Sequence, residues 1–222
     1  MELIIILIII LLPTIAQIKV KTNYSKYSKR PNSINMTGKQ VAEKILQTNG
    51  LTNIRILETG GTLTDHYDPT NKVIRLSKNI YNDTSISAAA VAAHEVGHAI
   101  QDKEAYSFLT LRTKLVPVVN FSSRISSIVI AISFIIESTG LLDIAIGLLF
   151  ISLLFQLITL PVEFNASKRA KEQLNHCGMI TNNDNKGIKK VLSAAALTYV
   201  AGFLASALDI IRLIIISNNR KN

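Results

Sequence analysis

The chain has 222 residues, of which 48% are hydrophobic and 18% charged; its mean hydropathy is +0.32 and its formal net charge +9. This hydrophobicity is high for a soluble domain and favours a membrane protein with a modest soluble part. The basic residues are spread through polar segments between apolar runs, as in cytoplasmic loops, which argues against a nucleic-acid-binding protein. Cys177 is the only cysteine, so an internal disulfide is excluded.

The first apolar run, Leu3 to Ile18, consists almost entirely of Ile and Leu and contains Pro13. With its flanks it is long enough to span a bilayer. A cleaved signal peptide is the alternative. However, Glu2 and no basic residue precede the run, whereas several Lys and Arg follow it between residues 19 and 30. We therefore predict an uncleaved anchor at residues 1–18, with the N-terminus outside and residue 19 onward in the cytoplasm.

A small α+β unit is predicted next, within residues 19–115. Thr37 to Asn49 has the pattern of an amphipathic helix, and Ile54–Leu57 and Lys72–Ser77 alternate as short strands do. A strand just before an active-site helix can lie at the rim of the cleft and pair with an extended peptide. The second strand is thus a candidate substrate-binding element through Val73, Ile74, Arg75 and Leu76. An ordinary edge strand is the alternative.

The alanine-rich stretch Ala88–Gln101 is predicted to be helical and contains the pentapeptide His94-Glu-Val-Gly-His98. Positions i and i+4 share one helix face, so the two imidazoles can bind one zinc ion. Glu95 is rotated by about 100° from His94, beside the metal, where it can accept a proton from the attacking water. A helix with merely polar histidines is the alternative, but their burial without a partner would be costly.

Three further apolar runs follow: Val116–Ile136, Leu141–Leu160 and Val191–Leu208, the last with an extension through residue 216. The first two are joined by a four-residue turn too short for anything but a hairpin. The predicted organisation is an anchor (1–18), a cytoplasmic catalytic part (19–115), a transmembrane hairpin (116–160), a second cytoplasmic segment (161–190) and a last transmembrane helix (191–216). The fold class is a mainly α membrane protein with about four transmembrane helices and a minimal zincin-like catalytic unit.

A third metal ligand is needed, because catalytic zinc usually has three protein ligands and one open position. Glu163 is the candidate, since it opens a helix-prone segment immediately after an apolar run. A glutamate favoured at a helix start by the macrodipole is the alternative. His176 lies thirteen residues further on and is a candidate oxyanion donor, although a surface histidine is the favoured interpretation.

Four segments together resemble the bacterial neutral zinc metallopeptidases of the membrane, the YugP-like family: residues 65–69, 73–77, 93–101 and 163–170. The resemblance covers nearly the whole chain. It implies a zinc peptidase of the glutamate-ligand (gluzincin) type, with His94, His98 and Glu163 on one Zn²⁺ and Glu95 as the catalytic base. The chain is more distantly similar to heat-shock and prenyl-protein membrane metallopeptidases, which carry an aspartate four residues after the glutamate ligand to orient a histidine. Ser167 occupies that position here, so Asn165 or another group is expected to serve instead.

The resulting hypothesis is a membrane-embedded zinc metalloendopeptidase that acts on peptides or membrane proteins. A catalytically silent zinc-binding scaffold or regulator is the main alternative, and a metal transporter is a second. Of the 24 Lys and Arg, 14 lie between residues 19 and 115 and six between 162 and 190, whereas the hairpin turn has none. Both ligand-bearing segments are therefore predicted to face the cytoplasm. The substrate and the oligomeric state are not encoded in any recognisable pattern.

Overall fold

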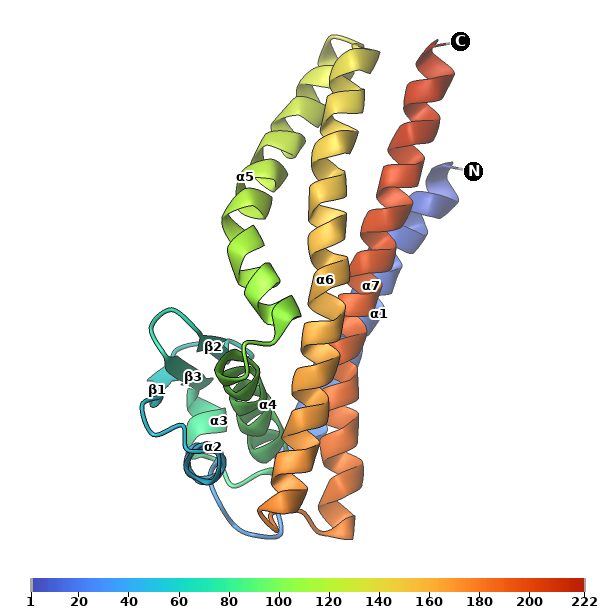
Figure 1. Ribbon diagram of the computed structural model, residues 1–222. Coiled ribbons are helices and arrows are strands. Elements are labelled where there is room, and N and C mark those ends of the chain that lie inside the picture. The colour runs from blue at the N-terminus through green and yellow to red at the C-terminus, as the bar shows by residue number, and fades with distance from the viewer. Residues whose placement is uncertain (1, 222) are drawn as a thin grey trace. The chain divides into compact units, whose positions relative to one another are not determined.

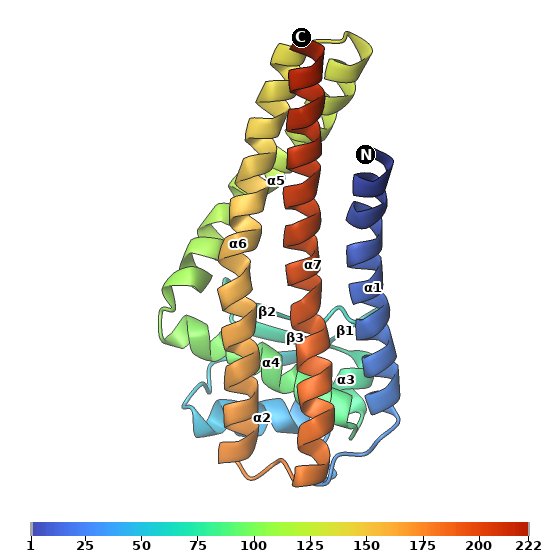
Figure 2. The same cartoon turned by 90° about the vertical axis from the view of Figure 1, so that its right-hand side faces the viewer.

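The computed structural model describes residues 2–221, which form two compact units. The first, here called the helical unit, comprises the chain up to Gln17, Thr110–Pro161 and the chain from Thr198. The second, the mixed unit, comprises Ile18–Leu109 and Val162–Leu197. The four long helices α1, α5, α6 and α7, labelled in Figure 2, each contribute residues to both units.

The chain is mainly helical, with three short strands (Figure 1). Its elements are α1 (Glu2–Ser28), α2 (Gly38–Thr48), β1 (Arg55–Thr59), β2 (His66–Asp68), β3 (Val73–Ser77), α3 (Lys78–Asn82), α4 (Ile86–Lys103), α5 (Ser107–Ile135), α6 (Thr139–His176) and α7 (Asn182–Lys221). Within residues 2–221, four helices are long and apolar enough to cross a membrane: α1, α5, α6 and α7. The fold is thus that of a mainly α membrane protein, as predicted.

All four long helices extend further than the apolar runs that predicted them, and two extensions matter most here. Helix α1 continues past Ile18 to Ser28, and α6 runs without interruption through Pro161 to His176. Proline was expected to end the span at Leu160, because it lacks the N–H that bonds to the preceding turn. A helix that packs on both sides of the proline tolerates the loss of that one bond. Glu163 therefore lies inside a continuous helix and does not begin a new one.

Polar side chains within the helical unit are paired with one another. Gln156 on α6 and Ser206 on α7 exchange hydrogen bonds, and Asp143 accepts a hydrogen bond from Ser217 at 2.6 Å. Large apolar side chains such as Phe121 and Ile144 remain more than half exposed. This pattern, polar groups facing other helices and apolar groups facing outward, is the one that a lipid environment requires.

The mixed unit is built around a three-stranded sheet with the order β1-β3-β2. The central strand β3 pairs in parallel with β1 and antiparallel with β2. Strand β2 was not among the strands predicted from the sequence. Helix α2 starts at a capping box formed by Thr37 and Gln40, and α4 starts at Ser85, whose hydroxyl accepts a hydrogen bond from Ala88 N.

The core of the mixed unit lies between the sheet, α2 and α4. Val73, Ile74 and Leu76 of β3 are fully buried, and so are most of the alanines along α4. The alanines explain why α4 can be buried on nearly all sides, because small side chains allow close approach of the neighbouring elements. This places the two histidines of α4 on a helix that is held from several directions.

Candidate metal centre

The two histidines of the pentapeptide lie on the same face of α4. Their ring centroids are 4.7 Å apart and the rings are nearly perpendicular, at 85°. Residues four positions apart on a helix are neighbours, so this proximity follows directly from the sequence spacing. Both side chains are mostly buried, with 13% of His94 and 9% of His98 exposed.

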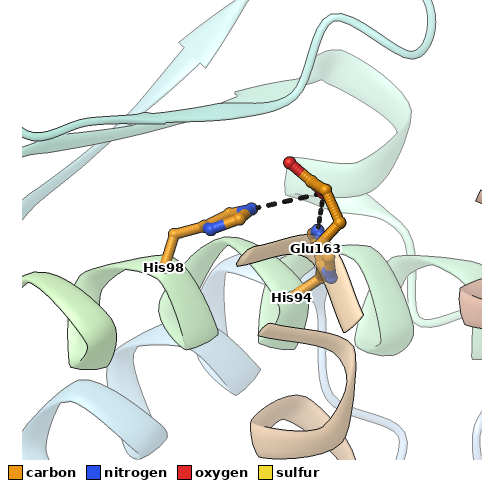
Figure 3. Close-up of side chains that lie close together, drawn as sticks. All are labelled: His94, His98 and Glu163. Atoms are coloured by element: carbon orange, nitrogen blue, oxygen red, sulfur yellow. Dashed lines mark hydrogen bonds and ion pairs between the residues drawn. The ribbon is translucent and has the colours of Figure 1, made fainter. Parts of the chain in front are cut away.

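Glu163 of α6 reaches the same point from a different helix (Figure 3). Its Oε2 atom lies 3.3 Å from His94 Nε2 and 3.7 Å from His98 Nε2. One ligand atom from each of the three residues lies within 4.8 Å of the others, and the glutamate side chain is only 3% exposed. The structure thus brings together the three residues that the sequence analysis named as ligands.

Gly97, inside the pentapeptide, allows α4 and α6 to come this close. A Cβ atom at this position would lie 2.6 Å from the carbonyl oxygen of Ala166, which is backbone and cannot turn away. Any larger residue would push α6 away from α4 and would withdraw Glu163 from the histidines. The glycine is therefore a packing requirement of the site, and Ala166 is the matching small residue on α6.

The other ring nitrogens of both histidines are hydrogen-bonded. His94 Nδ1 lies 3.2 Å from Ser167 Oγ, and His98 Nδ1 lies 3.0 Å from Gln101 Oε1. Ser167, four residues after Glu163 on α6, thus contacts a histidine through its hydroxyl. Asn165, named from the sequence as a substitute for that aspartate, contacts Gln101 and Arg169 and neither histidine directly.

The three residues fit zinc. Two ligands bound to a tetrahedral zinc at about 2.0–2.1 Å lie about 3.3 Å apart, close to the separations of the two histidine nitrogens from Glu163 Oε2. Two imidazoles and one carboxylate are the ligand set of several catalytic zinc sites, and the hydrogen bonds at both Nδ1 atoms leave the Nε2 atoms directed at the metal. Among residues 2–221, no fourth ligand belongs to the group.

Glu95 is buried next to this group but is not part of it. Burial raises the pKa of its carboxyl to about 7; the charge of His94 opposes this rise, while those of Glu163 and Asp65 add to it. The backbone N–H of Tyr67, on β2, donates a hydrogen bond to the carboxylate. The arrangement therefore places a buried carboxyl group with a raised pKa beside the three candidate ligand residues.

The sequence analysis expected a peptide to pair with Val73–Leu76, but these residues have no free edge with which a peptide could pair. Strand β3 is central, and its two edges are occupied by β1 and β2. Its residues contribute to the core: Val73, Ile74 and Leu76 are buried, and Arg75 pairs with Asp68 at 3.2 Å. The edge strand next to Glu95 is β2, through Tyr67.

The remaining two histidines are not part of the group. His176 ends α6, thirteen residues beyond Glu163, and is exposed; the helical rise puts it about 20 Å along the axis. It is therefore not placed to stabilise an oxyanion at the metal. The exposed ring of His66 lies 2.8 Å from the carbonyl oxygen of Thr64, which is a local turn contact.

Tyr67 and Gln101 belong to the sequence motifs but were not predicted to have a role at the site. The backbone N–H of Tyr67 contacts the Glu95 carboxylate, and its hydroxyl donates a hydrogen bond to Asp102 on α4 at 2.6 Å. Tyr67 therefore links β2 to α4 at two points. Gln101 is fully buried and contacts His98. The sequence could have indicated a role for Gln101, because it is a polar residue one turn beyond His98 on an otherwise apolar helix face.

Comparisons with known proteins agree with this site. Residues 2–218 match the family described as "Putative neutral zinc metallopeptidase". The chain is 49% identical over 207 residues to "Putative membrane protease YugP" of Bacillus subtilis (strain 168). The matched region covers 93% of this chain and 92% of that protein. No solved structure matches the chain. Since the family match extends over nearly all residues, the chain belongs to the neutral zinc metallopeptidase family and is a multi-pass membrane protein of that family.

Proposed function

We propose that this protein is a zinc-dependent endopeptidase of the membrane in which His94, His98 and Glu163 hold the metal and Glu95 is the general base. The observation that carries the proposal is the position of Glu95: it is buried beside the three ligand atoms, yet is not one of them. When bound, zinc supplies a Lewis acid that polarises the scissile carbonyl and lowers the pKa of water.

The protein's own residues account for the proton transfers. Glu95 accepts the proton of the attacking water and delivers it to the leaving amine, a role that needs a pKa near the working pH. Its pKa of about 7 in the metal-free protein suits this exchange. The N–H of Tyr67 keeps the carboxylate in place while its protonation changes. The three-ligand set supports catalysis over the scaffold alternative, because a purely structural zinc usually has four protein ligands.

We further propose that the peptide substrate runs along β2. This strand is at the edge of the sheet, and its residue Tyr67 contacts Glu95, so a peptide paired with it passes beside the catalytic carboxylate. Backbone hydrogen bonds to an edge strand recognise extended peptides with little dependence on sequence. The strand comprises only His66–Asp68, so it offers few such bonds.

Removal of the metal tests the proposed function. Purified protein in detergent is expected to cleave an unfolded substrate such as casein, to lose this activity after treatment with a chelator, and to regain it when zinc is returned. The loss is expected to be complete, because the residues that remain cannot polarise the carbonyl. Cleavage that persists at full rate in metal-free protein, verified by atomic absorption, would contradict the proposal.

The active site is proposed to face the cytoplasm. One ion cannot be held from both sides of a bilayer, so the chain between His98 and Glu163 must cross the membrane an even number of times. Helices α5 and α6 supply two crossings, and the basic residues gather in the segments that carry the ligands. The predicted boundaries of the membrane and cytoplasmic segments are part of this proposal.

Cysteine labelling on intact cells tests the orientation. Gly140, in the first turn of α6, is exposed and has open space around a Cβ; Ser107, at the start of α5, is also exposed. In a Cys177→Ser background, Gly140→Cys is expected to react with a membrane-impermeant maleimide, whereas Ser107→Cys reacts only after lysis. The reverse pattern would place the active site outside.

A further inference from the structure

Gln101 contacts both ligand-bearing helices at once. It lies one turn beyond His98 on α4, is fully buried, and its Oε1 atom is 3.0 Å from His98 Nδ1. Its Nε2 atom donates to the carbonyl oxygen of Val162 at 2.8 Å and to Asn165 Oδ1 at 2.9 Å, both on α6. Val162 immediately precedes Glu163. The Gln101 side chain therefore contacts His98 directly and also contacts the backbone next to Glu163.

The orientation of this amide is determined by its partners. A backbone carbonyl can only accept, so the atom of Gln101 that faces Val162 must be the NH₂ nitrogen. Arg169 supports the same orientation independently: its Nε, which can only donate, lies 2.6 Å from Asn165 Oδ1, so that the oxygen of the Asn165 amide is the atom turned toward Gln101 and Arg169. Arg169 is itself held by Glu104 at 2.6 Å.

The orientation of Gln101 determines which nitrogen of His98 carries a proton. Because Gln101 presents its oxygen to His98 Nδ1, this nitrogen must be the donor. In the neutral ring, the lone pair is then on Nε2, the atom that faces Glu163. His94 differs, because its partner Ser167 has a hydroxyl that can either donate or accept and therefore does not select a tautomer.

We propose that Gln101 is a positioning residue of the metal site, which fixes the Nδ1–H tautomer of His98 and holds α6 at Val162, so that His98 Nε2 and Glu163 are presented together to the metal. The inference rests on the proposed function in that the metal is zinc. Its own content is the direction of the hydrogen bonds: His98 Nδ1–H donates to Gln101 Oε1, and Gln101 and Arg169 both donate to Asn165 Oδ1. This direction exists with or without catalysis.

Two substitutions separate orientation from packing. Gln101→Leu removes both the acceptor for His98 and the donor to α6. Gln101→Glu keeps an acceptor toward His98 Nδ1 but has no donor for Val162 O. Gln173→Leu is the matched control, because Gln173 on α6 is partly buried and accepts a hydrogen bond from Asn49 at 2.7 Å, away from the ligands.

Zinc affinity is measured by competition with a chromophoric chelator in detergent-solubilised protein. Gln101→Leu is expected to bind zinc about 10- to 100-fold more weakly than the wild type, the usual cost of losing a hydrogen bond to a metal-bound histidine. Gln101→Glu is expected to lose less than about tenfold while melting at a lower temperature, and Gln173→Leu to bind as the wild type does. Equal losses in both Gln101 variants, or a loss in Gln173→Leu, would overturn the proposal.

A second measurement does not depend on zinc binding. The chain has only four histidines, so ring-¹⁵N-labelled protein gives few imidazole signals. A protected Nδ1–H signal of His98, assigned by its absence in His98→Asn, is expected in the wild type and in Gln101→Glu but not in Gln101→Leu. An unprotonated Nδ1 in the wild type would refute the inference. If instead the wild type shows this signal but binds no zinc, the proposed function fails and the hydrogen-bond direction stands.

Discussion

Glu95→Gln is expected to lower peptide hydrolysis by about 10²- to 10⁴-fold, the usual contribution of a general base, while zinc remains bound. The amide has the same shape as the carboxylate and can still accept the hydrogen bond from Tyr67 N, but it cannot take up a proton. Because burial already raises the pKa of this carboxyl to about 7, which means that burial favours its neutral form, a neutral replacement should not destabilise the fold. Initial rates and zinc content of the purified variant are the measurements.

Glu43→Gln provides the control for this experiment. Glu43 is a partly exposed residue of α2 that pairs with Lys39 at 3.6 Å, so its replacement makes the same chemical change outside the site. This variant is expected to cleave substrate at the wild-type rate. Unchanged cleavage by Glu95→Gln would remove Glu95 from the mechanism, and loss of zinc in this variant would make Glu95 a ligand or a structural support of the site.

Glu163→Ala is expected to have the opposite signature, with loss of zinc as well as activity. It deletes one of three ligands and also leaves two histidines without the carboxylate that lies 3.3 and 3.7 Å from their Nε2 atoms. The zinc affinity should fall by more than about 100-fold, the upper end of the cost of losing an outer hydrogen bond. Zinc retention during dialysis against a mild chelator distinguishes this variant from Glu95→Gln.

Glu172→Ala, on the same helix, is the matched control. Glu172 is exposed and forms an ion pair with Lys168 at 3.8 Å, a contact that contributes little to stability at a surface. Zinc binding is expected to be unaffected. If Glu163→Ala retained zinc as well as Glu172→Ala does, the third ligand would have to be sought elsewhere, and the family relationship would not be sufficient to identify it.

The parts of the fold that could be predicted are those governed by a single local rule. Backbone polar groups in lipid must be satisfied within the helix, so a long apolar run such as Leu141–Leu160 predicts a helix with few alternatives. The spacing of His94 and His98 predicts a shared helix face, because residues four positions apart on a helix are neighbours. Glu163 could not be predicted as a ligand in this way, because no local rule connects it to residues far earlier in the chain. Its assignment rested on its place after an apolar run and on the family resemblance.

The failures came where tertiary contacts outweigh local preferences. Strand β2 has only three residues, His66 to Asp68, all polar or aromatic, and it is a strand because β3 pairs with it. That pairing also made β3 central, which no pattern in Val73–Ser77 reveals. The role of Gln101 depends on Val162, 61 residues away, and becomes visible only when α4 and α6 are side by side.

The order in which the ligands leave the ribosome has a consequence for the cell. Glu163 follows His94 by 69 residues, and the two helices proposed to cross the membrane as a hairpin, α5 and the first part of α6, lie between them. At about 5–20 residues per second, the growing chain carries an incomplete metal site for several seconds. A chain that stalls before or within the hairpin has two of its three ligands and cannot form the proposed catalytic centre. Assembly of the proposed centre therefore requires that the whole chain between His98 and Glu163 be synthesised first.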